Sequence, residues 1–214
     1  MQFELLIVLA CCVSAYFMGS INFAILISSV FYGKDIRNYG SKNAGMTNVF
    51  RTFGKIPAIL TFVGDFSKGM ISIFMCNILF SVFLKEESPI YASGLIGICA
   101  LLGHVFPIFY KFKGGKGVSV SAGVLLAVDW SVFLCVFLIF ILIFLVSKII
   151  SLSSIISALT YPIFTFIKCI IMDRERIDFV MCVFFTLIIS LIIVFMHRSN
   201  IRRLLKGNEP KIKM

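Results

Sequence analysis

Long apolar runs separated by short polar connections organise this chain. The runs cover residues 3–32, 57–84, 89–110, 117–128, 131–147, 153–172 and 177–196. A helix needs about 20 predominantly apolar residues to cross a bilayer. The run 117–128 is too short for this at about 1.5 Å per residue, and predicts a tilted, half or re-entrant helix. The pattern therefore predicts an all-α integral membrane protein, a bundle of about seven transmembrane helices.

Composition supports a membrane protein and excludes a soluble domain. Of the 214 residues, 60% are hydrophobic and 14% are charged, whereas about a quarter of a soluble domain is charged. We find no repeat or linker and expect a single polytopic domain over 1–214. The seven cysteines form no CxxC pair and no His stands at metal-ligand spacing, so we expect no disulfide, metal or cofactor.

Basic residues gather in alternate connections between the runs. Fifteen of the twenty Lys and Arg residues lie in 33–56, 111–116, 148–152 and the tail from 197, and four lie in the other connections. Cytoplasmic loops of membrane proteins carry the excess of Lys and Arg. The N-terminus is therefore predicted outside and the C-terminus in the cytoplasm. The net charge of +10 favours anionic lipid headgroups and anionic substrates as partners, not nucleic acid.

The connection 33–56 mixes cations with small polar residues, and reads GSKNAGMTNVFR from Gly40 to Arg51. Glycine lets backbone N–H groups approach an anion, Ser, Thr and Asn donate hydrogen bonds, and Arg adds a bidentate charge. The segment is either a phosphate-binding loop or a polar turn whose Arg51 reaches lipid headgroups. Its candidate binding residues are Ser41, Asn43, Thr47, Asn48 and Arg51.

A second polar segment, KFKGGKGV over 111–118, leads directly into the short run 117–128. A helix N-terminus offers unpaired N–H groups and the positive end of the helix dipole to an anion. The segment is not a P-loop, because the GxxxxGK[ST] spacing is missing and no strand precedes it. Alone it would indicate a turn, but beside other polar loops it indicates an anion site. Its candidates are Lys113, Gly114, Gly115, Lys116 and Gly117.

Two further polar segments belong to the same predicted face. We expect Ser151 or Ser153 to cap the helix of the run 153–172, which leaves Ser154 to direct its hydroxyl at a phosphate. The tail from 197 to 210 predicts an amphipathic segment at the membrane interface. Within it, His197 and Asn200 stand three residues apart, so they share one face and could reach a bound polyol.

Asp65, Lys68 and His104 are ionisable residues inside apolar runs, where charge is costly. Asp65 and Lys68 are three residues apart and predict a structural ion pair. For His104, in the segment GHVFP, a core role and a catalytic role both stay open. No acidic residue stands within 105–110, so we expect no local histidine–carboxylate dyad of the kind that activates a hydroxyl.

Together these segments resemble the bacterial acyl-phosphate:glycerol-3-phosphate acyltransferases, the PlsY family. The resemblance covers nearly the whole chain. It rests on Gly19 to Phe23, Gly40 to Arg51, Asp65 to Gly69, Gly103 to Pro107, Lys113 to Val118, Ser151 to Ile155 and His197 to Glu209. The family usually has Gly at the position of Lys42 and Ala at that of Met46, and residues 118–121 also differ.

The resemblance implies a seven-helix enzyme of the bacterial inner membrane, with its site on the cytoplasmic side. It implies transfer of a fatty acyl group from acyl phosphate to the sn-1 hydroxyl of glycerol 3-phosphate, which gives lysophosphatidic acid and inorganic phosphate. Residues implied to bind the phosphates and the glycerol backbone are Ser41, Arg51, Lys116, Ser154, His197 and Asn200. Residues implied to support them are Asn43, Thr47, Asn48, Lys113, Gly114, Gly115, Gly117, His104 and Glu209.

An acyl phosphate is already activated, so the enzyme must chiefly orient a hydroxyl and stabilise the departing phosphate. We expect a phosphate oxygen of the donor to take the hydroxyl proton, and the competing hypothesis is that His197 or His104 takes it. A small transporter of a phosphorylated metabolite is the alternative function, against which stands the lack of inverted repeats. A third possible function is that of a scaffold protein.

Overall fold

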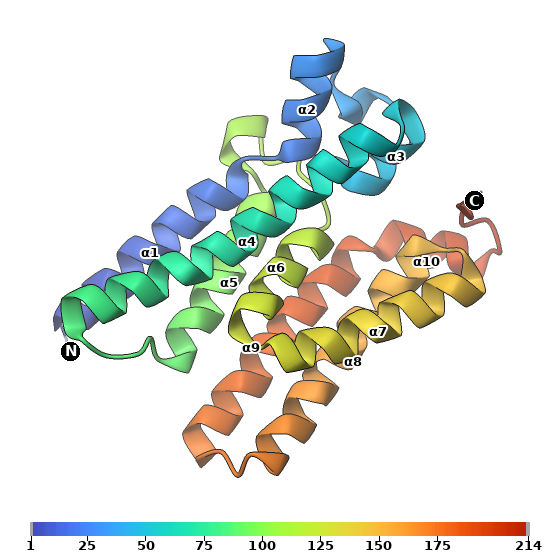
Figure 1. The fold of residues 1–214 in the computed structure, drawn as a ribbon. Helices are drawn as coiled ribbons and strands as arrows, with labels where there is room; N and C mark the ends of the chain where they lie inside the picture. The colour runs from blue at the N-terminus through green and yellow to red at the C-terminus, as the bar shows by residue number, and fades with distance from the viewer. Residues whose placement is uncertain (1, 213–214) are drawn as a thin grey trace. The chain divides into compact units, whose positions relative to one another are not determined.

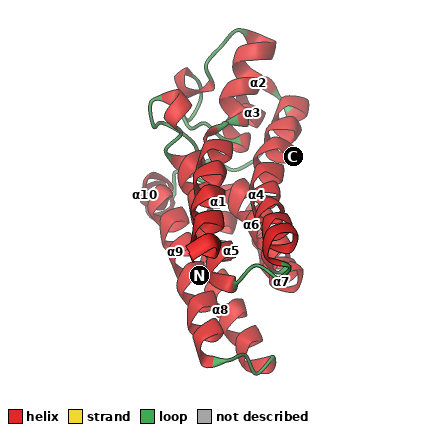
Figure 2. Cartoon of the chain, turned by 90° about the vertical axis from the view of Figure 1, so that its left-hand side faces the viewer, coloured by secondary structure: helices red, strands yellow, loops and turns green. Residues whose placement is uncertain are grey.

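The computed structural model describes residues 2–212, and every regular element in that range is a helix (Figures 1 and 2). Six helical stretches in the described range are long and apolar enough to cross a membrane, which confirms the all-α membrane prediction. The chain divides into two compact units, residues 1–128 and 129–214, which we describe separately. One functional domain over 1–214 stays a prediction.

The first unit contains six α-helices and two short 3-10 helices within its described residues. In chain order they are α1 (Gln2–Ser20), α2 (Phe23–Tyr32), η1 (Ile36–Asn38), α3 (Met46–Phe53), α4 (Lys55–Leu84), α5 (Ile90–Val105), η2 (Ile108–Tyr110) and α6 (Val118–Val128). Helix α1 packs against α5 and α4, and α4 also packs against α6. The 11-residue α6 spans about 16 Å, which is about half of a bilayer core.

The first apolar run is not the uninterrupted helix that its length suggested. It breaks between α1 and α2 because the Asn22 side chain caps α2 and accepts a hydrogen bond from the Ile25 N–H at 3.0 Å. The break leaves the carbonyl of Ile21 without a helical partner, and the Lys68 ammonium donates to it at 2.6 Å. A buried Lys in α4 thus provides the hydrogen-bond partner of the Ile21 carbonyl at the break.

Paired glycines bring the helices of this unit into close contact. A Cβ at Gly19 of α1 would lie 2.2 Å from the Ala100 carbonyl oxygen of α5, and one at Gly103 of α5 would lie 2.2 Å from that of Tyr16. Gly69 of α4 and Gly123 of α6 make a second such contact. Small residues at membrane helix interfaces allow this approach of backbones, which van der Waals packing then stabilises.

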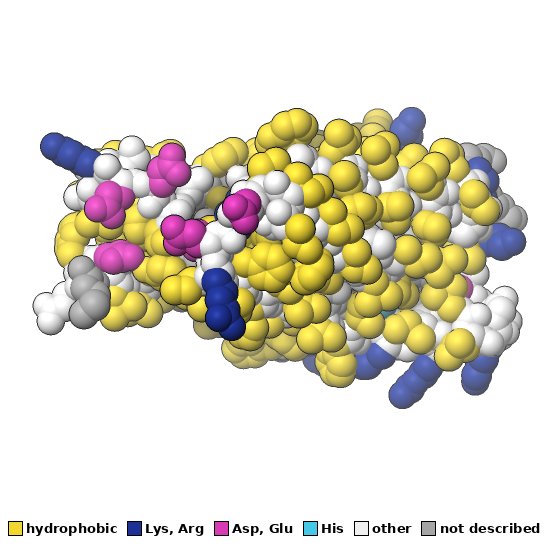
Figure 3. Space-filling view, turned by 90° about the horizontal axis from the view of Figure 1, so that it is seen from below, with side chains coloured by type: hydrophobic (Ala, Val, Ile, Leu, Met, Phe, Trp, Pro, Cys, Tyr) yellow, Lys and Arg dark blue, Asp and Glu magenta, His cyan; other side chains and the backbone are white. Residues whose placement is uncertain are grey.

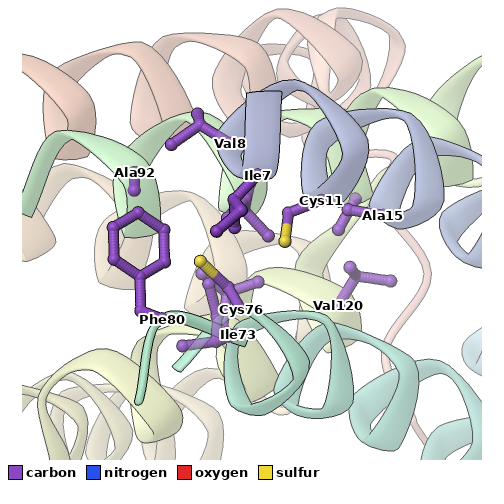
Figure 4. Packing of buried hydrophobic residues seen from close by; sticks show 12 residues of the cluster. Ile7, Val8, Cys11, Ala15, Ile73, Cys76, Phe80, Ala92 and Val120 are labelled. Atoms are coloured by element: carbon purple, nitrogen blue, oxygen red, sulfur yellow. The ribbon is translucent and has the colours of Figure 1, made fainter. Parts of the chain in front are cut away.

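The buried core of the first unit lies where these four helices meet (Figure 4). Figure 4 shows side chains of α1 and α4 directed toward one another, with Ala92 of α5 and Val120 of α6 at the edges of the cluster. Its largest member is Phe80, which is 1% exposed. A smaller cluster, which includes Ile25, Ile36 and Val49, lies under the connection between α2 and α4.

The described residues of the second unit form three long helices and a short one. They are α7 (Trp130–Ser147), α8 (Ile150–Ile171), α9 (Arg176–Met196) and α10 (Arg198–Leu205). Helix α8 packs against both α7 and α9. Large hydrophobic side chains such as Leu142 and Val146 of α7 are exposed, as expected of a surface in contact with lipid. Hydrophobic side chains likewise cover much of the face in Figure 3.

We predict that Gly69→Ala and Gly123→Ala each lower stability by about 1–3 kcal/mol, the usual cost of overpacking. The added methyl groups would lie 2.3 Å from the Val120 carbonyl oxygen and 1.9 Å from that of Phe66. Thermal unfolding in detergent measures the change. Gly45→Ala is the control, because its Cβ would meet only the end of the Asn43 side chain, at 3.0 Å. Equal unfolding temperatures for all three variants would contradict the prediction.

Candidate functional site

Asn48 organises the first polar loop of unit 1 from its buried position on α3. Its amide nitrogen lies 3.2, 3.0 and 3.0 Å from the carbonyl oxygens of Ile36, Tyr39 and Asn43. Its amide oxygen accepts a hydrogen bond from the Ser41 N–H at 2.8 Å. Asn48 is 1% exposed. It is therefore a buried residue whose hydrogen bonds fix the backbone of the loop.

The loop presents other predicted residues outward. Ser41 and Arg51 are exposed, and Asn43 and Thr47 are half-buried. Gly40 has a φ of +54°, and a Cβ there would lie 2.3 Å from the Asn48 amide oxygen. Only glycine fits this turn without strain. The loop therefore has a rigid backbone with polar side chains on its open face, as an anion-binding loop requires.

Arg37 joins the first loop to the glycine-rich loop. Its guanidinium donates to both carboxylate oxygens of Asp35, at 2.7 Å for the shortest pair, and to the carbonyl oxygens of Tyr110 and Lys113 at 2.8 and 3.3 Å. The hydrogen bonds from Arg37 lower the pKa of Asp35 below its ordinary value. Two segments more than 70 residues apart in sequence are thus connected through one charged side chain.

The glycine-rich loop rests on the C-terminal end of α5. Gly114 N–H donates to the Val105 carbonyl and Gly115 N–H to the His104 carbonyl, both at 3.2 Å. A Cβ at Gly115 would lie 2.2 Å from Nε2 of His104. Gly117 has a φ of +85° and is followed at once by α6. The loop-to-helix junction predicted from the sequence is confirmed, and its glycines are required by close contact.

A buried cluster of charge lies beneath this loop. The Lys68 ammonium donates to Asp65 Oδ1 at 2.7 Å and lies 3.0 Å from Nδ1 of His104. The predicted Asp65–Lys68 ion pair is confirmed. No acidic residue follows His104 closely in the sequence, but a carboxylate lies near it in space, since Asp65 Oδ1 is 3.4 Å from its Nδ1. The carboxylate comes from α4, a neighbour in space that the sequence around His104 does not include.

The two histidines have opposite tautomers. An ammonium group can only donate, so Nδ1 of His104 accepts from Lys68 and the ring proton sits on Nε2. Nδ1 of His197 lies 2.8 Å from the Ile193 carbonyl oxygen. A carbonyl can only accept, so Nδ1 of His197 carries the proton and its Nε2 has the lone pair. In these neutral forms, Nε2 of His104 is a donor and Nε2 of His197 is an acceptor.

Glu209 is the centre of the polar cluster in unit 2. Its Oε1 accepts hydrogen bonds from Ser151 Oγ at 2.6 Å and Asn200 Nδ2 at 2.5 Å, and its Oε2 accepts from Arg203 Nε at 2.6 Å. One carboxylate thereby connects the start of α8, helix α10 and the tail. Burial by itself would raise the pKa of Glu209, but these hydrogen bonds outweigh it and lower the pKa below its ordinary value.

The serines at the start of α8 do not cap it, contrary to expectation. The helix begins one residue before Ser151, its N-cap is Ile149, and no side chain caps it there. Ser153 and Ser154 donate to carbonyls one turn earlier, Ser154 to that of Ile150 at 2.9 Å. The oxygen of Ser154 keeps acceptor capacity, while Ser151 is engaged by Glu209.

The sequence did not indicate three residues whose hydrogen bonds hold the loops in place: Asn22, Asp35 and Arg37. A lone Asn in an apolar run was the available signal for Asn22, whose amide donates to the Ala44 carbonyl of the first loop at 3.3 Å. For Arg37 no signal distinguished it from the other cations of its connection, because its partners, the carbonyls of Tyr110 and Lys113, belong to a distant segment.

The chain is similar along most of its length to one group of enzymes. A family model described as glycerol-3-phosphate acyltransferase matches residues 9–207. The glycerol-3-phosphate acyltransferase of Nitrosomonas eutropha is 39% identical over 199 residues, which cover 93% of this chain and 94% of that protein. That of Staphylococcus carnosus is 41% identical over 203 residues, which cover 93% and 95%.

Solved structures agree with these relatives. A crystal structure of PlsY, an integral membrane glycerol 3-phosphate acyltransferase, in its glycerol 3-phosphate form has a TM-score of 0.82 and 35% identity to this chain, and the match covers 96% of each. The lysophosphatidic acid form has a TM-score of 0.79 and 34% identity, and the match covers 96% of this chain and 95% of the other.

We predict that Glu209 makes stability depend on pH. Its folded-state pKa is lowered, so its contribution is fully present above the unfolded value of about 4.3 and is lost as pH falls through the folded pKa. Thermal unfolding of wild type and Glu209→Gln between pH 3 and pH 7 measures this. The difference between the two proteins should be largest at neutral pH and should shrink in acid. A difference that does not vary with pH would refute it.

Proposed function

Because the chain belongs to the glycerol-3-phosphate acyltransferase family, we propose that it transfers a fatty acyl group from acyl phosphate to the sn-1 hydroxyl of glycerol 3-phosphate. The products are lysophosphatidic acid and inorganic phosphate. Membership makes the chain an integral membrane acyltransferase of lipid biosynthesis. The acyl phosphate donor and the identity of the product are the parts that we propose.

The observation that carries this proposal is the connection between two glycine-containing loops in unit 1. Arg37 ties the first loop to the carbonyls of Tyr110 and Lys113 beside the second. The N–H groups of Gly114 and Gly115 are used within the chain, and the N-terminus of α6 directly after this loop offers its backbone N–H groups to an anion. We assign phosphate binding to Ser41, Arg51 and Lys116. Asn43, Thr47, Asn48, Lys113, His104 and the glycines of the second loop support them.

In unit 2, Ser154, His197 and Asn200 are the proposed binding residues, and Glu209 supports them. The hydrogen bond from Asn200 to Glu209 fixes the orientation of the Asn200 amide. His197 ends α9 and begins α10, so its position is set by two helices. The Ser154 hydroxyl, the Nε2 of His197 and the Asn200 amide together suit a polyol phosphate, which offers hydroxyl donors and phosphate acceptors.

The reaction requires orientation and charge stabilisation more than a covalent nucleophile. The sn-1 oxygen of glycerol 3-phosphate forms an ester bond with the acyl carbon, and the bond from that carbon to the donor phosphate breaks. The hydroxyl proton passes to a phosphate oxygen of the donor and leaves with inorganic phosphate. In the competing version, His197 takes the proton first, because its Nε2 has the lone pair, whereas Nε2 of His104 is protonated.

Purified protein in detergent should release inorganic phosphate from acyl phosphate only when glycerol 3-phosphate is present. Lys116→Ala should lower kcat/KM about a hundredfold or more, as expected for removal of a group that stabilises developing charge. Lys55→Ala is the matched control, because Lys55 is an exposed cation of the same unit without an assigned role.

Activity with acyl-CoA but not with acyl phosphate would overturn the proposed donor. Release of phosphate without glycerol 3-phosphate, or uptake of a phosphorylated metabolite into vesicles without acyl transfer, would favour a different function. Equal loss of activity in Lys55→Ala and Lys116→Ala would show that general basic charge, and not the loop, is responsible.

Variants of the two histidines distinguish the two hypotheses for which group takes the hydroxyl proton. If the donor phosphate takes the proton, His197→Gln should weaken substrate binding while the pH profile of kcat keeps its shape. If His197 is the base, the same change should lower kcat about a hundredfold and remove a titration from the profile. His104→Gln is the comparison, and its pH profile should be unchanged because its Nε2 is already protonated.

We also propose that the enzyme lies in the bacterial inner membrane with its polar loops facing the cytoplasm. Single cysteines placed at the exposed residues Lys34 and Lys206 of a cysteine-free variant should react with an impermeant maleimide only after the cells are opened. Cysteines at Glu87 and Arg174, also exposed, should react in intact cells. The reverse pattern would invert the topology, and a mixed one would contradict the charge argument.

A further inference from the structure

The reaction described above uses neither Asp65 nor Lys68, although both are almost completely buried. Lys68 is 3% exposed and Asp65 is 1% exposed. Desolvating two charges is costly, and a buried ion pair can often be replaced by apolar residues without loss of stability. A contribution to stability therefore does not by itself explain why the Asp65–Lys68 ion pair is buried here. The additional contacts of the Lys68 ammonium indicate what else it does.

One of these contacts leads to the first polar loop. The ammonium donates to the Ile21 carbonyl at 2.6 Å. The next residue, Asn22, caps α2 with its side-chain oxygen and donates its amide to the Ala44 carbonyl. The Phe23 ring covers the ammonium at 5.9 Å from its centroid. Lys68 thus fixes the backbone from which Asn22 reaches the loop that contains Ser41 and Arg51.

The other contact leads to the glycine-rich loop. Lys68 Nζ lies 3.0 Å from Nδ1 of His104, and this contact sets both the tautomer and the orientation of the ring. The His104 carbonyl accepts from Gly115 N–H at 3.2 Å, and its ring lies against Gly115, where a Cβ would be 2.2 Å from Nε2. Gly115 is directly followed by Lys116, so the position of the ring bears on that of Lys116.

We propose that Lys68 is a positioning residue for acyl transfer. It orients His104 and the Asn22 turn together, and so sets the relative position of the two phosphate-binding loops of unit 1. Asp65 neutralises the ammonium and fixes its direction. This inference rests on the proposed roles of Arg51 and Lys116. It makes the three donor hydrogens of one ammonium the common support of both loops.

The wild-type protein tests the first step directly. The chain has two histidines, so protein labelled with ¹⁵N-histidine gives two imidazole spin systems, which His197→Gln assigns. At neutral pH we expect the proton on Nε2 in His104 and on Nδ1 in His197. A His104 ring protonated on Nδ1 would overturn the proposal, and this result is read from wild-type protein, with His197→Gln used only to assign the signals.

The second step uses Asp65→Leu/Lys68→Met, which removes both charges and leaves no unpaired buried ion. We expect His104 to lose its preference for the Nε2-protonated form and kcat/KM to fall at least about tenfold, since small displacements of binding groups are costly. The control is Asp129→Leu/Lys168→Met. It makes the same exchange at an ion pair of 2.7 Å in unit 2, and should leave activity and the His104 tautomer unchanged.

An unchanged His104 tautomer in the Asp65/Lys68 variant would overturn the proposal even if activity fell, because the loss would then reflect packing alone. Activity within twofold of wild type would overturn it as well. Transfer is followed as labelled lysophosphatidic acid formed from glycerol 3-phosphate, with acyl phosphate and acyl-CoA tested in parallel. If only acyl-CoA supports transfer in wild type, the proposed donor is wrong, while the comparison of variants proceeds with that donor.

Discussion

Inside a bilayer core, a backbone group without a hydrogen-bond partner costs several kcal/mol, so a helix can break there only where something else satisfies the freed groups. The break between α1 and α2 meets this constraint through Lys68, whose ammonium donates to the Ile21 carbonyl at 2.6 Å. The break allows α2 to begin a new helix at Phe23 and lets Asn22 reach the first polar loop.

Glycine determines how closely the rest of the first unit assembles. Gly19 and Gly103 allow α1 and α5 to touch backbone to backbone, and Gly69 and Gly123 do the same for α4 and α6. In the polar loops, Gly115 allows close contact with the His104 ring. The same property, the lack of a Cβ, therefore allows close helix packing in the apolar part and close packing of the glycine-rich loop against His104.

The polar residues divide into those that are buried and shape the loops and those for which we propose a role in binding. Asn48, Asn22 and Glu209 are hydrogen-bonded to backbone groups or to neighbouring side chains, whereas Ser41 and Arg51 are exposed. The two histidines, which have opposite tautomers, differ in the same way. His104 receives a hydrogen bond from Lys68 and supports the loop, and His197 presents an acceptor nitrogen. A motif that contains both kinds of residue does not by itself distinguish them, because each kind is polar and occurs in the same short segments.

The amino-acid sequence alone determined the helical membrane class, the positions of the long helices within a few residues, the short helix after the glycine-rich loop and the Asp65–Lys68 pair. These follow from local rules, since apolar runs of sufficient length must be helical in a membrane and an ion pair at i, i+3 needs only one helix. Only the tertiary structure decided that Asp65 lies beside His104, that Arg37 connects the two loops and that Ser151 binds Glu209 instead of capping α8. Each of these interactions joins residues at least 39 positions apart. Their geometry depends on how helices pack, which no local pattern of residues encodes.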